Sequence, residues 1–227
     1  MSEAPMKIIA TVRSGFPSKF GIPRQSGIVK NLPAKIIFEP EFRNPDAIRG
    51  LDGFSHLWLI WKFSESVESN SLTVRPPRLG GNTRMGVFST RSPFRPNPIG
   101  LSCVKIASIE QTEKFGTIIN ILGADLMDGT PIYDIKPYLP HSDCIPDAIG
   151  GFSDDVKDYC LKVKIPDQIR ERFDGQFIET ISEILAHDPR PSYHNDPERI
   201  YGFPYAGYEI KFKVFEEIII AESIDKI

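Results

Sequence analysis

The 227-residue chain has few cysteines and lacks a long apolar run. Its cysteines, Cys103, Cys144 and Cys160, are too few and too scattered for a disulfide framework or a zinc site. It has no stretch of about eighteen apolar residues, and its first six residues lack the basic and apolar regions of a secretory signal. We therefore expect a protein of the reducing cytoplasm, with no membrane span and no metal.

Several common site motifs are also missing. The chain has no GxGxxG after a strand and no GxxxxGK[ST], so neither a Rossmann site nor a P-loop is predicted. It has no GxSxG and no HExxH, and its four histidines do not pair at ligand spacing. The sequence thus shows none of the usual nucleotide-binding or hydrolytic signatures.

Acidic residues are absent from one long segment. Residues 69–109 contain no Asp or Glu, although the whole chain has 30 of them against 27 Lys and Arg. The cations of this arginine-rich segment are Arg75, Arg78, Arg84, Arg91, Arg95 and Lys105. The segment therefore carries +6, which leaves 21 basic against 30 acidic residues, or −9, for the rest. Because a cationic site on an acidic body focuses anionic ligands, we expect this segment to line the active site.

The arginine-rich segment is also predicted to be stiff. Prolines fix φ, and glycines let a ligand approach the backbone; both are crowded between Val74 and Leu101. The alternative is a solvated basic loop that only aids solubility. We favour the binding site, because solvated loops rarely combine such rigidity with so little acidic compensation.

The first 140 residues carry apolar stretches that predict strands. These stretches are residues 8–12, 34–38, 54–63, 85–90, 101–110 and 117–122. The stretch 54–63 is apolar and aromatic enough to be buried on both faces. Several short strands without helices between them predict a barrel or a sandwich.

The pattern changes after residue 141. Residues 154–164 have helical spacing, and a longer helical pattern runs from Pro166 to Leu185, weakened at Gly175. Residues 208–215 and 217–224 predict two strands joined by a tight turn. We therefore expect a mainly β chain, with a β domain at 1–140 and a smaller α+β domain at 141–227.

Three further segments carry candidate site residues. The loop 20–27 is rigid and offers Arg24 and Gln25, although an ordinary turn is the stronger interpretation of it alone. Asp125, at the end of an apolar strand, is a better candidate than Asp128, whose Asp-Gly pair also signals a turn. The loop 185–193 is suited to phosphate and base contact, or it simply terminates a helix.

Together these segments resemble the TrmO (YaeB/TsaA-like) family. The resemblance rests on Pro23-Arg24-Gln25, residues 49–58 (RGLDGFSHLW), 75–81 (RPPRLGG), 94–101 (FRPNPIGL), 128–131 (DGTP), 134–138 (DIKPY) and 188–191 (DPRP), with Tyr193. It implies a β-barrel that binds S-adenosylmethionine (SAM), not a Rossmann sheet. It also implies methylation of N6 of threonylcarbamoyladenosine (t6A) in tRNA, beside the anticodon, by a homodimer with the cofactor near its subunit interface.

The resemblance also implies a cofactor site. Its residues correspond to Pro23, Arg24, Gln25, Ser64, Glu65, Arg91, Leu101, Asp125, Leu126, Met127 and Asp128. Many family members have a His-Gln-like pair where this chain has Ser64 and Glu65. We therefore expect these two residues to contact SAM through their backbone. Arg91 suits the SAM carboxylate, and Asp125 suits an amine or a ribose hydroxyl. Asp134 or Asp125 is our candidate general base.

RNA contacts are expected from five further arginines and one tyrosine. The candidates are Arg75, Arg78, Arg84, Arg95, Arg190 and Tyr193. The four arginines before residue 100 suit tRNA phosphates or the carboxylate of the modified base. A non-catalytic RNA- or anion-binding barrel is the alternative, and a structural role in an assembly is a third possibility. Thermal stabilisation by SAM separates the first two.

Overall fold

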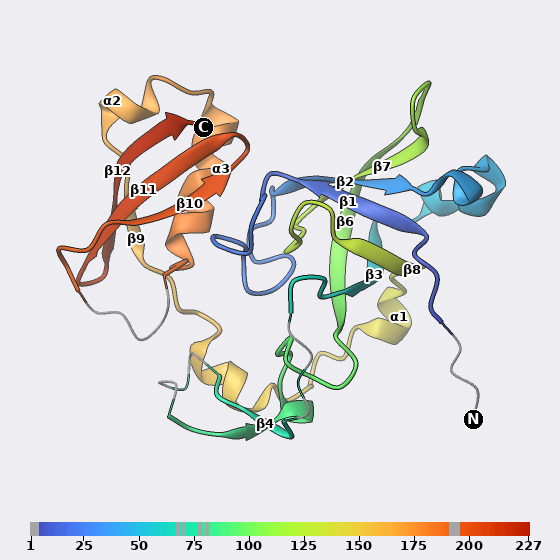
Figure 1. The fold of residues 1–227 in the computed structure, drawn as a ribbon, viewed down its shortest axis with the longest axis horizontal. Coiled ribbons are helices and arrows are strands. Elements are labelled where there is room, and N and C mark those ends of the chain that lie inside the picture. The colour runs from blue at the N-terminus through green and yellow to red at the C-terminus, as the bar shows by residue number, and fades with distance from the viewer. Residues whose placement is uncertain (1–4, 67–68, 70, 77–78, 80–81, 191–195) are drawn as a thin grey trace.

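The fold consists of a β-barrel and a C-terminal α+β unit (Figure 1). One hydrophobic core lies inside the barrel and a second lies in the C-terminal unit. The computed structural model describes residues 5–66, 69, 71–76, 79, 82–190 and 196–227. The mainly β prediction, a barrel with a smaller C-terminal α+β part, is confirmed. No helix in these ranges is long and apolar enough to cross a membrane.

Six antiparallel strands close the barrel in the order β1-β2-β7-β6-β3-β8. Their bounds are β1 Ala10–Ser14, β2 Pro33–Phe38, β3 His56–Lys62, β6 Ile99–Thr112, β7 Gly116–Leu122 and β8 Pro131–Pro137. Alternate residues of each strand point inward; on β3 these are Leu57, Leu59 and Trp61. Closure pairs the backbone of every strand and removes exposed edges.

The strand β3 is not buried on both faces, so that expectation is wrong. Trp58 lies on its outer face, where its ring packs 5.8 Å from Tyr138 and its Nε1 donates to Asp143 at 2.9 Å. A barrel has one packed interior, and the outer face of β3 is covered only in part, by the chain around the short helix α1 (Pro140–Asp143). Three 3₁₀ turns, η1 Pro40–Phe42, η2 Pro45–Ile48 and η3 Leu51–Gly53, connect β2 to β3.

The arginine-rich segment contains less strand than expected before β6. Two short strands, β4 (Thr73–Val74) and β5 (Met85–Gly86), pair with each other. The predicted strand 85–90 is wrong beyond Gly86, because the 3₁₀ turn η5 (Val87–Ser89) follows. Thr90 closes that turn by donating its hydroxyl to the Val87 carbonyl at 2.9 Å, a local bond that competes with strand pairing. The strand β8, where Pro, Asp and Lys interrupt the alternation, was not predicted.

The C-terminal unit packs the helix α3 (Gly175–Ala186) with a four-stranded sheet. Its strands, in the order β10-β11-β12-β9, are β10 Tyr201–Tyr205, β11 Tyr208–Phe215, β12 Ile218–Lys226 and β9 Lys162–Lys164. The two predicted C-terminal strands are confirmed as β11 and β12, whereas β10 was not predicted.

Both helix predictions needed correction. The helix predicted at 154–164 is wrong: a 3₁₀ segment, η6 (Gly151–Val156), precedes β9, which pairs parallel with β12. The pattern from Pro166 to Leu185 is divided into α2 (Asp167–Arg170) and α3, with the break just before Gly175. Asp174 caps α3 by accepting from the Phe177 amide at 2.9 Å, which ends one helix and starts the next.

Candidate functional site

A buried hydroxyl inside the barrel holds the carboxylate of Asp125. Ser102, fully buried on β6, donates to Asp125 Oδ1 at 2.6 Å, and the Trp61 indole donates to the same hydroxyl oxygen at 3.0 Å. Gly100 faces the Trp61 ring so closely that a Cβ there would overlap it. Burial raises the pKa of Asp125, while hydrogen bonds from Ser102 and the Ser26 backbone and the Arg91 charge partly offset that shift.

The loop 15–32 between β1 and β2 reaches the same place. The Gln25 side-chain oxygen accepts from Arg91 Nη1 at 2.5 Å, and the Ser26 hydroxyl accepts from the Cys103 amide at 3.0 Å. Gly27 donates its amide to the Gly123 carbonyl at 2.9 Å. The fold therefore brings together three of the predicted segments: the Pro-Arg-Gln loop, the arginine-rich segment and the start of the 125–128 run.

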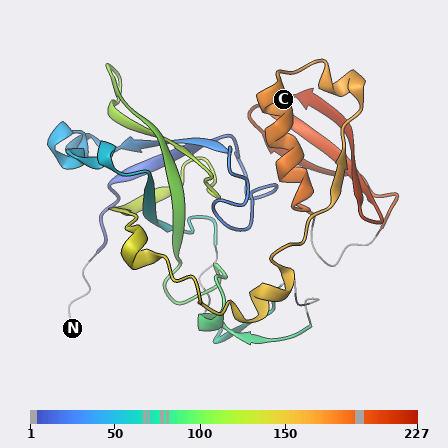
Figure 2. The same cartoon turned by 180° about the vertical axis from the view of Figure 1, so that it is seen from behind.

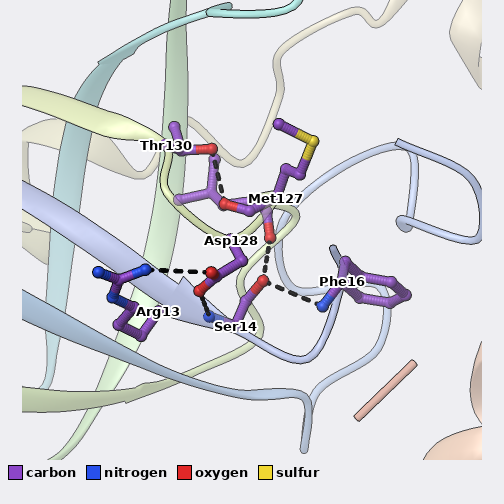
Figure 3. Close-up of polar contacts among 7 residues, drawn as sticks. Arg13, Ser14, Phe16, Met127, Asp128 and Thr130 are labelled. Atoms are coloured by element: carbon purple, nitrogen blue, oxygen red, sulfur yellow. Dashed lines mark hydrogen bonds and ion pairs between the residues drawn. The ribbon is translucent and has the colours of Figure 1, made fainter. Parts of the chain in front are cut away.

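Asp128 has a different environment from Asp125 (Figure 3). Its carboxylate accepts from the Ser14 amide at 3.1 Å and pairs with Arg13 at 3.1 Å. Ser14 in turn donates its hydroxyl to the Leu126 carbonyl at 2.8 Å, and Thr130 donates to the Met127 carbonyl at 2.7 Å. These contacts tie the 125–128 run to the end of β1, where the loop 15–32 begins.

Other predicted cofactor residues are spread around this network. Leu126 is buried in the barrel core, so its side chain is shielded from any ligand. Leu101 is 51% exposed on the outer face of β6. Ser64 and Glu65 are exposed in the turn after β3. Pro23 is buried, whereas Arg24 is exposed and donates to the Asp188 carbonyl at 3.5 Å.

Asp134, the other candidate base, lies on the outer face of β8. It is paired in register with Ile60, while the neighbouring Ile135 packs inward against Leu59. Its carboxylate forms an ion pair with Lys136 at 3.0 Å. The ion pair of Asp134 with Lys136 and the hydrogen bond of Asp125 with Ser102 thus place the two carboxylates in different environments.

The predicted RNA-contact residues divide into three groups. Arg75 and Arg84 are exposed beside β4 and β5, where Arg84 donates to the Thr73 hydroxyl at 3.3 Å; Arg95 donates to the Thr90 carbonyl at 3.1 Å. Arg190 is only 12% exposed and pairs with Asp188 at 3.0 Å. Arg78 and Tyr193 lie outside the described residues.

Sequence reasoning missed Ser26, Ser102 and Trp61. Ser102 had a detectable signal, because it occupies an inward position of β6 between Gly100 and Val104, where a polar residue needs a partner. Ser26 and Trp61 had no such signal, since their partners lie far away in the sequence.

Two family models together match nearly the whole chain. The tRNA-methyltransferase O N-terminal domain matches residues 11–144, and the TrmO C-terminal domain matches residues 153–227. The chain belongs to the tRNA-methyltransferase O (TrmO) family. The resemblance seen in the sequence is thereby confirmed.

Relatives of this TrmO-family chain include bacterial and archaeal proteins. It is 40% identical over 221 residues to the Escherichia coli K12 tRNA (adenine(37)-N6)-methyltransferase, covering 94% of this chain and 93% of that protein. A Pyrococcus abyssi "Probable S-adenosyl-L-methionine-binding protein" is 36% identical over 135 residues, or 60% of this chain and 68% of that protein. A crystal structure of TrmO from Pseudomonas aeruginosa matches with TM-score 0.79 and 29% identity, covering 98% of both chains.

Replacing Asp125 by Asn is expected to change how the stability of this TrmO-family chain depends on pH. Because folding raises the pKa of Asp125 above its ordinary 3.8, the folded state holds its proton more tightly than the unfolded state does. The contribution of Asp125 to the free energy of unfolding therefore falls as the pH rises from below 3.8 through the raised pKa. Asparagine does not titrate. The free energy of unfolding of Asp125→Asn, relative to that of the wild type, should therefore increase as the pH rises through this range.

Urea unfolding between about pH 4 and about pH 8 measures this difference. Asp155→Asn, at an exposed position of η6, is the matched control and should show little change with pH relative to wild type. A pH-independent difference for Asp125→Asn would contradict the assigned effect of burial.

Proposed function

We propose that the chain transfers a methyl group from SAM to N6 of t6A at position 37 of tRNA. The observation that carries this proposal is the meeting of Gln25, Arg91 and Asp125 at one end of the barrel. The tRNA (adenine(37)-N6)-methyltransferase name of the Escherichia coli relative supports the reaction, and the name of the Pyrococcus relative supports the cofactor.

The donor set at this place suits SAM chemically. When bound, SAM supplies an electrophilic methyl group on a sulfonium cation; it also carries a carboxylate, an amine, a ribose and an adenine. Arg91 is exposed and donates to Gln25, and its guanidinium suits the SAM carboxylate. The amide of Gln25 can donate to an acceptor while its oxygen holds Arg91, and Asp125 offers a carboxylate oxygen to a hydroxyl or an amine.

Asp125 is the better of the two candidate bases for the N6 proton. A carboxyl whose pKa is raised by burial accepts a proton more readily than an ordinary one. Asp134 lies on the outer face of β8, and its carboxylate is already engaged in an ion pair with Lys136. The carbonyl attached to N6 of t6A withdraws charge and acidifies the N6–H, so a modest base is sufficient. Alignment of N6 with the methyl group supplies the larger part of catalysis.

Three arginines of the arginine-rich segment are proposed to hold tRNA. Arg75 directly follows β4 and Arg84 directly precedes β5, so both charges lie beside the same small strand pair. Arg95 is anchored by the Thr90 carbonyl, which limits its freedom before RNA arrives. Phosphate contacts of this kind position RNA without reading its sequence.

We also propose that the protein works in the cytoplasm as a homodimer. Large apolar side chains remain exposed along the arginine-rich segment: Leu72 at 70%, Phe88 at 77% and Leu101 at 51%. Contiguous exposed apolar side chains mark an interaction surface, and the proposed dimer would cover these three.

For a homodimer we expect sedimentation equilibrium of the wild-type protein to give the mass of two chains. Phe88→Asp should shift the equilibrium toward monomer, because it places a charge in the proposed interface. Lys211→Asp, at an exposed position of β11 in the C-terminal sheet, is the control and should leave the dimer intact. A monomeric wild type at micromolar concentration would exclude the dimer.

Methyl transfer is tested by mass spectrometry of tRNA nucleosides after incubation with SAM. We expect a gain of one methyl group on t6A, and none on tRNA prepared without the threonylcarbamoyl group. Asp125→Asn should abolish the product if Asp125 takes the proton. Binding of tRNA without any methylated product would favour the non-catalytic RNA-binding barrel.

Arg91 and Arg75 should separate cofactor binding from tRNA binding. Arg91→Ala is expected to weaken SAM binding in calorimetry by about tenfold or more, since a charge-assisted contact to the carboxylate is lost. Arg75→Ala should keep SAM affinity but reduce the salt slope of tRNA binding by about 0.7 to 0.9, the value for one phosphate contact. Unchanged SAM affinity in Arg91→Ala would remove Arg91 from the cofactor site.

A further inference from the structure

The loop 15–32, which carries Gln25 and Ser26, belongs to the C-terminal core and not to the barrel core. Phe16, Val29 and Leu32 are at most 2% exposed, and they pack in one cluster with apolar residues from Leu161 onward. The Phe16 ring lies 4.9 Å from the ring of Tyr205 on β10. In Figures 1 and 2 the blue loop after β1 extends toward the orange α3 and the C-terminal sheet. The loop 15–32 is therefore packed against the C-terminal unit.

Two glycines of the loop bring its backbone against β10. A Cβ on Gly15 would lie 2.5 Å from the Tyr205 ring, and the Gly15 carbonyl accepts from the Ala206 amide at 2.7 Å. Gly21 has a φ of +84°, and a Cβ there would overlap the Phe203 ring. No space is left for the loop to shift toward the sheet, so its position is set by the C-terminal unit.

A buried charged cluster lies beside this contact. The side chains of Asp188 and Arg190 are 7% and 12% exposed, and Arg190 Nε donates to Asp188 Oδ1 at 3.0 Å. The Tyr159 hydroxyl donates to Asp188 Oδ2 at 3.0 Å. The backbone carbonyl of Asp188 accepts from Arg24 of the loop. A buried ion pair is weak evidence for stability, and its best-attested use is to select one arrangement of the chain.

The loop connects this cluster to the site within a few residues. Arg24 contacts Asp188, the next residue Gln25 contacts Arg91, and Ser26 contacts the Cys103 amide on β6. Three consecutive residues therefore link the Asp188 cluster to the groups around Asp125.

We propose that Asp188, Arg190 and Tyr159 are positioning residues for the cofactor site. The C-terminal unit holds the loop 15–32 in the shape that places Gln25 and Ser26 against the barrel. In this role the buried Arg190 pairs with Asp188 and does not bind an RNA phosphate. The inference rests on the proposed use of SAM at this site.

The test uses the full chain and three variants of graded severity. Tyr159→Phe removes one hydroxyl, Asp188→Asn removes the buried charge, and Gly21→Ala forces the loop away from Phe203. For Asp188→Asn and Gly21→Ala we expect KM for SAM to rise about tenfold or more, while kcat and KM for tRNA stay within about twofold. Tyr159→Phe should change KM for SAM in the same direction by a smaller factor, because that ring is partly exposed and the loss of its hydroxyl contacts leaves the Asp188–Arg190 ion pair in place.

Ile219→Ala is the control for a general loss of stability. Ile219 is buried in the same core but lies on β12, separated from β10 by β11. It should lower the melting temperature without changing KM for SAM below that temperature. The Cys103 amide donates a hydrogen bond to the Ser26 hydroxyl. Hydrogen exchange at this amide should become faster in Asp188→Asn but not in Ile219→Ala.

Three results would overturn the inference. One is an unchanged KM for SAM in both Tyr159→Phe and Gly21→Ala. Another is an equal rise of KM for SAM in Ile219→Ala. The third is a rise of KM for tRNA alone in Asp188→Asn, which would return Arg190 to RNA binding. Failure of the wild-type chain to bind SAM in calorimetry would instead remove the proposed function.

Discussion

The hydrogen bond from Ser102 to Asp125 is the contact on which the site depends. It places a carboxylate at the end of the barrel interior, where burial raises the pKa of that group and where the Trp61 indole fixes the donor. Ser102 on β6 and Trp61 on β3 meet because those two strands pair in the barrel. The charge of Arg91 and the Ser26 backbone then offset part of the cost of the buried carboxylate.

The site is held between two hydrophobic cores with different tasks. The barrel core supports Ser102, Asp125 and the start of the 125–128 run. The C-terminal core supports the loop 15–32, which lies before β2 in the chain but packs with residues after 160. Asp128 joins the two supports at the end of β1, through the Ser14 amide. The proposed cofactor site is therefore supported by both cores, although the groups assigned to it come from the first 128 residues.

Much of the fold was predictable from local patterns. Strands with clean alternation or continuous apolar runs, such as β2 and β7, were found at nearly their observed bounds. The errors share a physical cause, since residues 85–90 and 154–164 have periodicities that neighbouring turns or sheet partners override. The strand β8 was missed because Asp134 and Lys136 share its outer face and break the apolar pattern, although its pairing with β3 closes the barrel.

Composition and short motifs in the chain were enough to indicate a stiff cationic segment, a separate Asp125 candidate and membership of the TrmO family, because each of these is a property of neighbouring residues. The tertiary structure decided which of those residues meet. Gln25 contacts Arg91 and Ser102 contacts Asp125, which packing brings together from distant parts of the sequence, and the surrounding structure buries the side chain of Arg190 against that of Asp188. Side-chain type limits what a residue can bind, but only barrel closure and the packing of the C-terminal core fix where its partner lies.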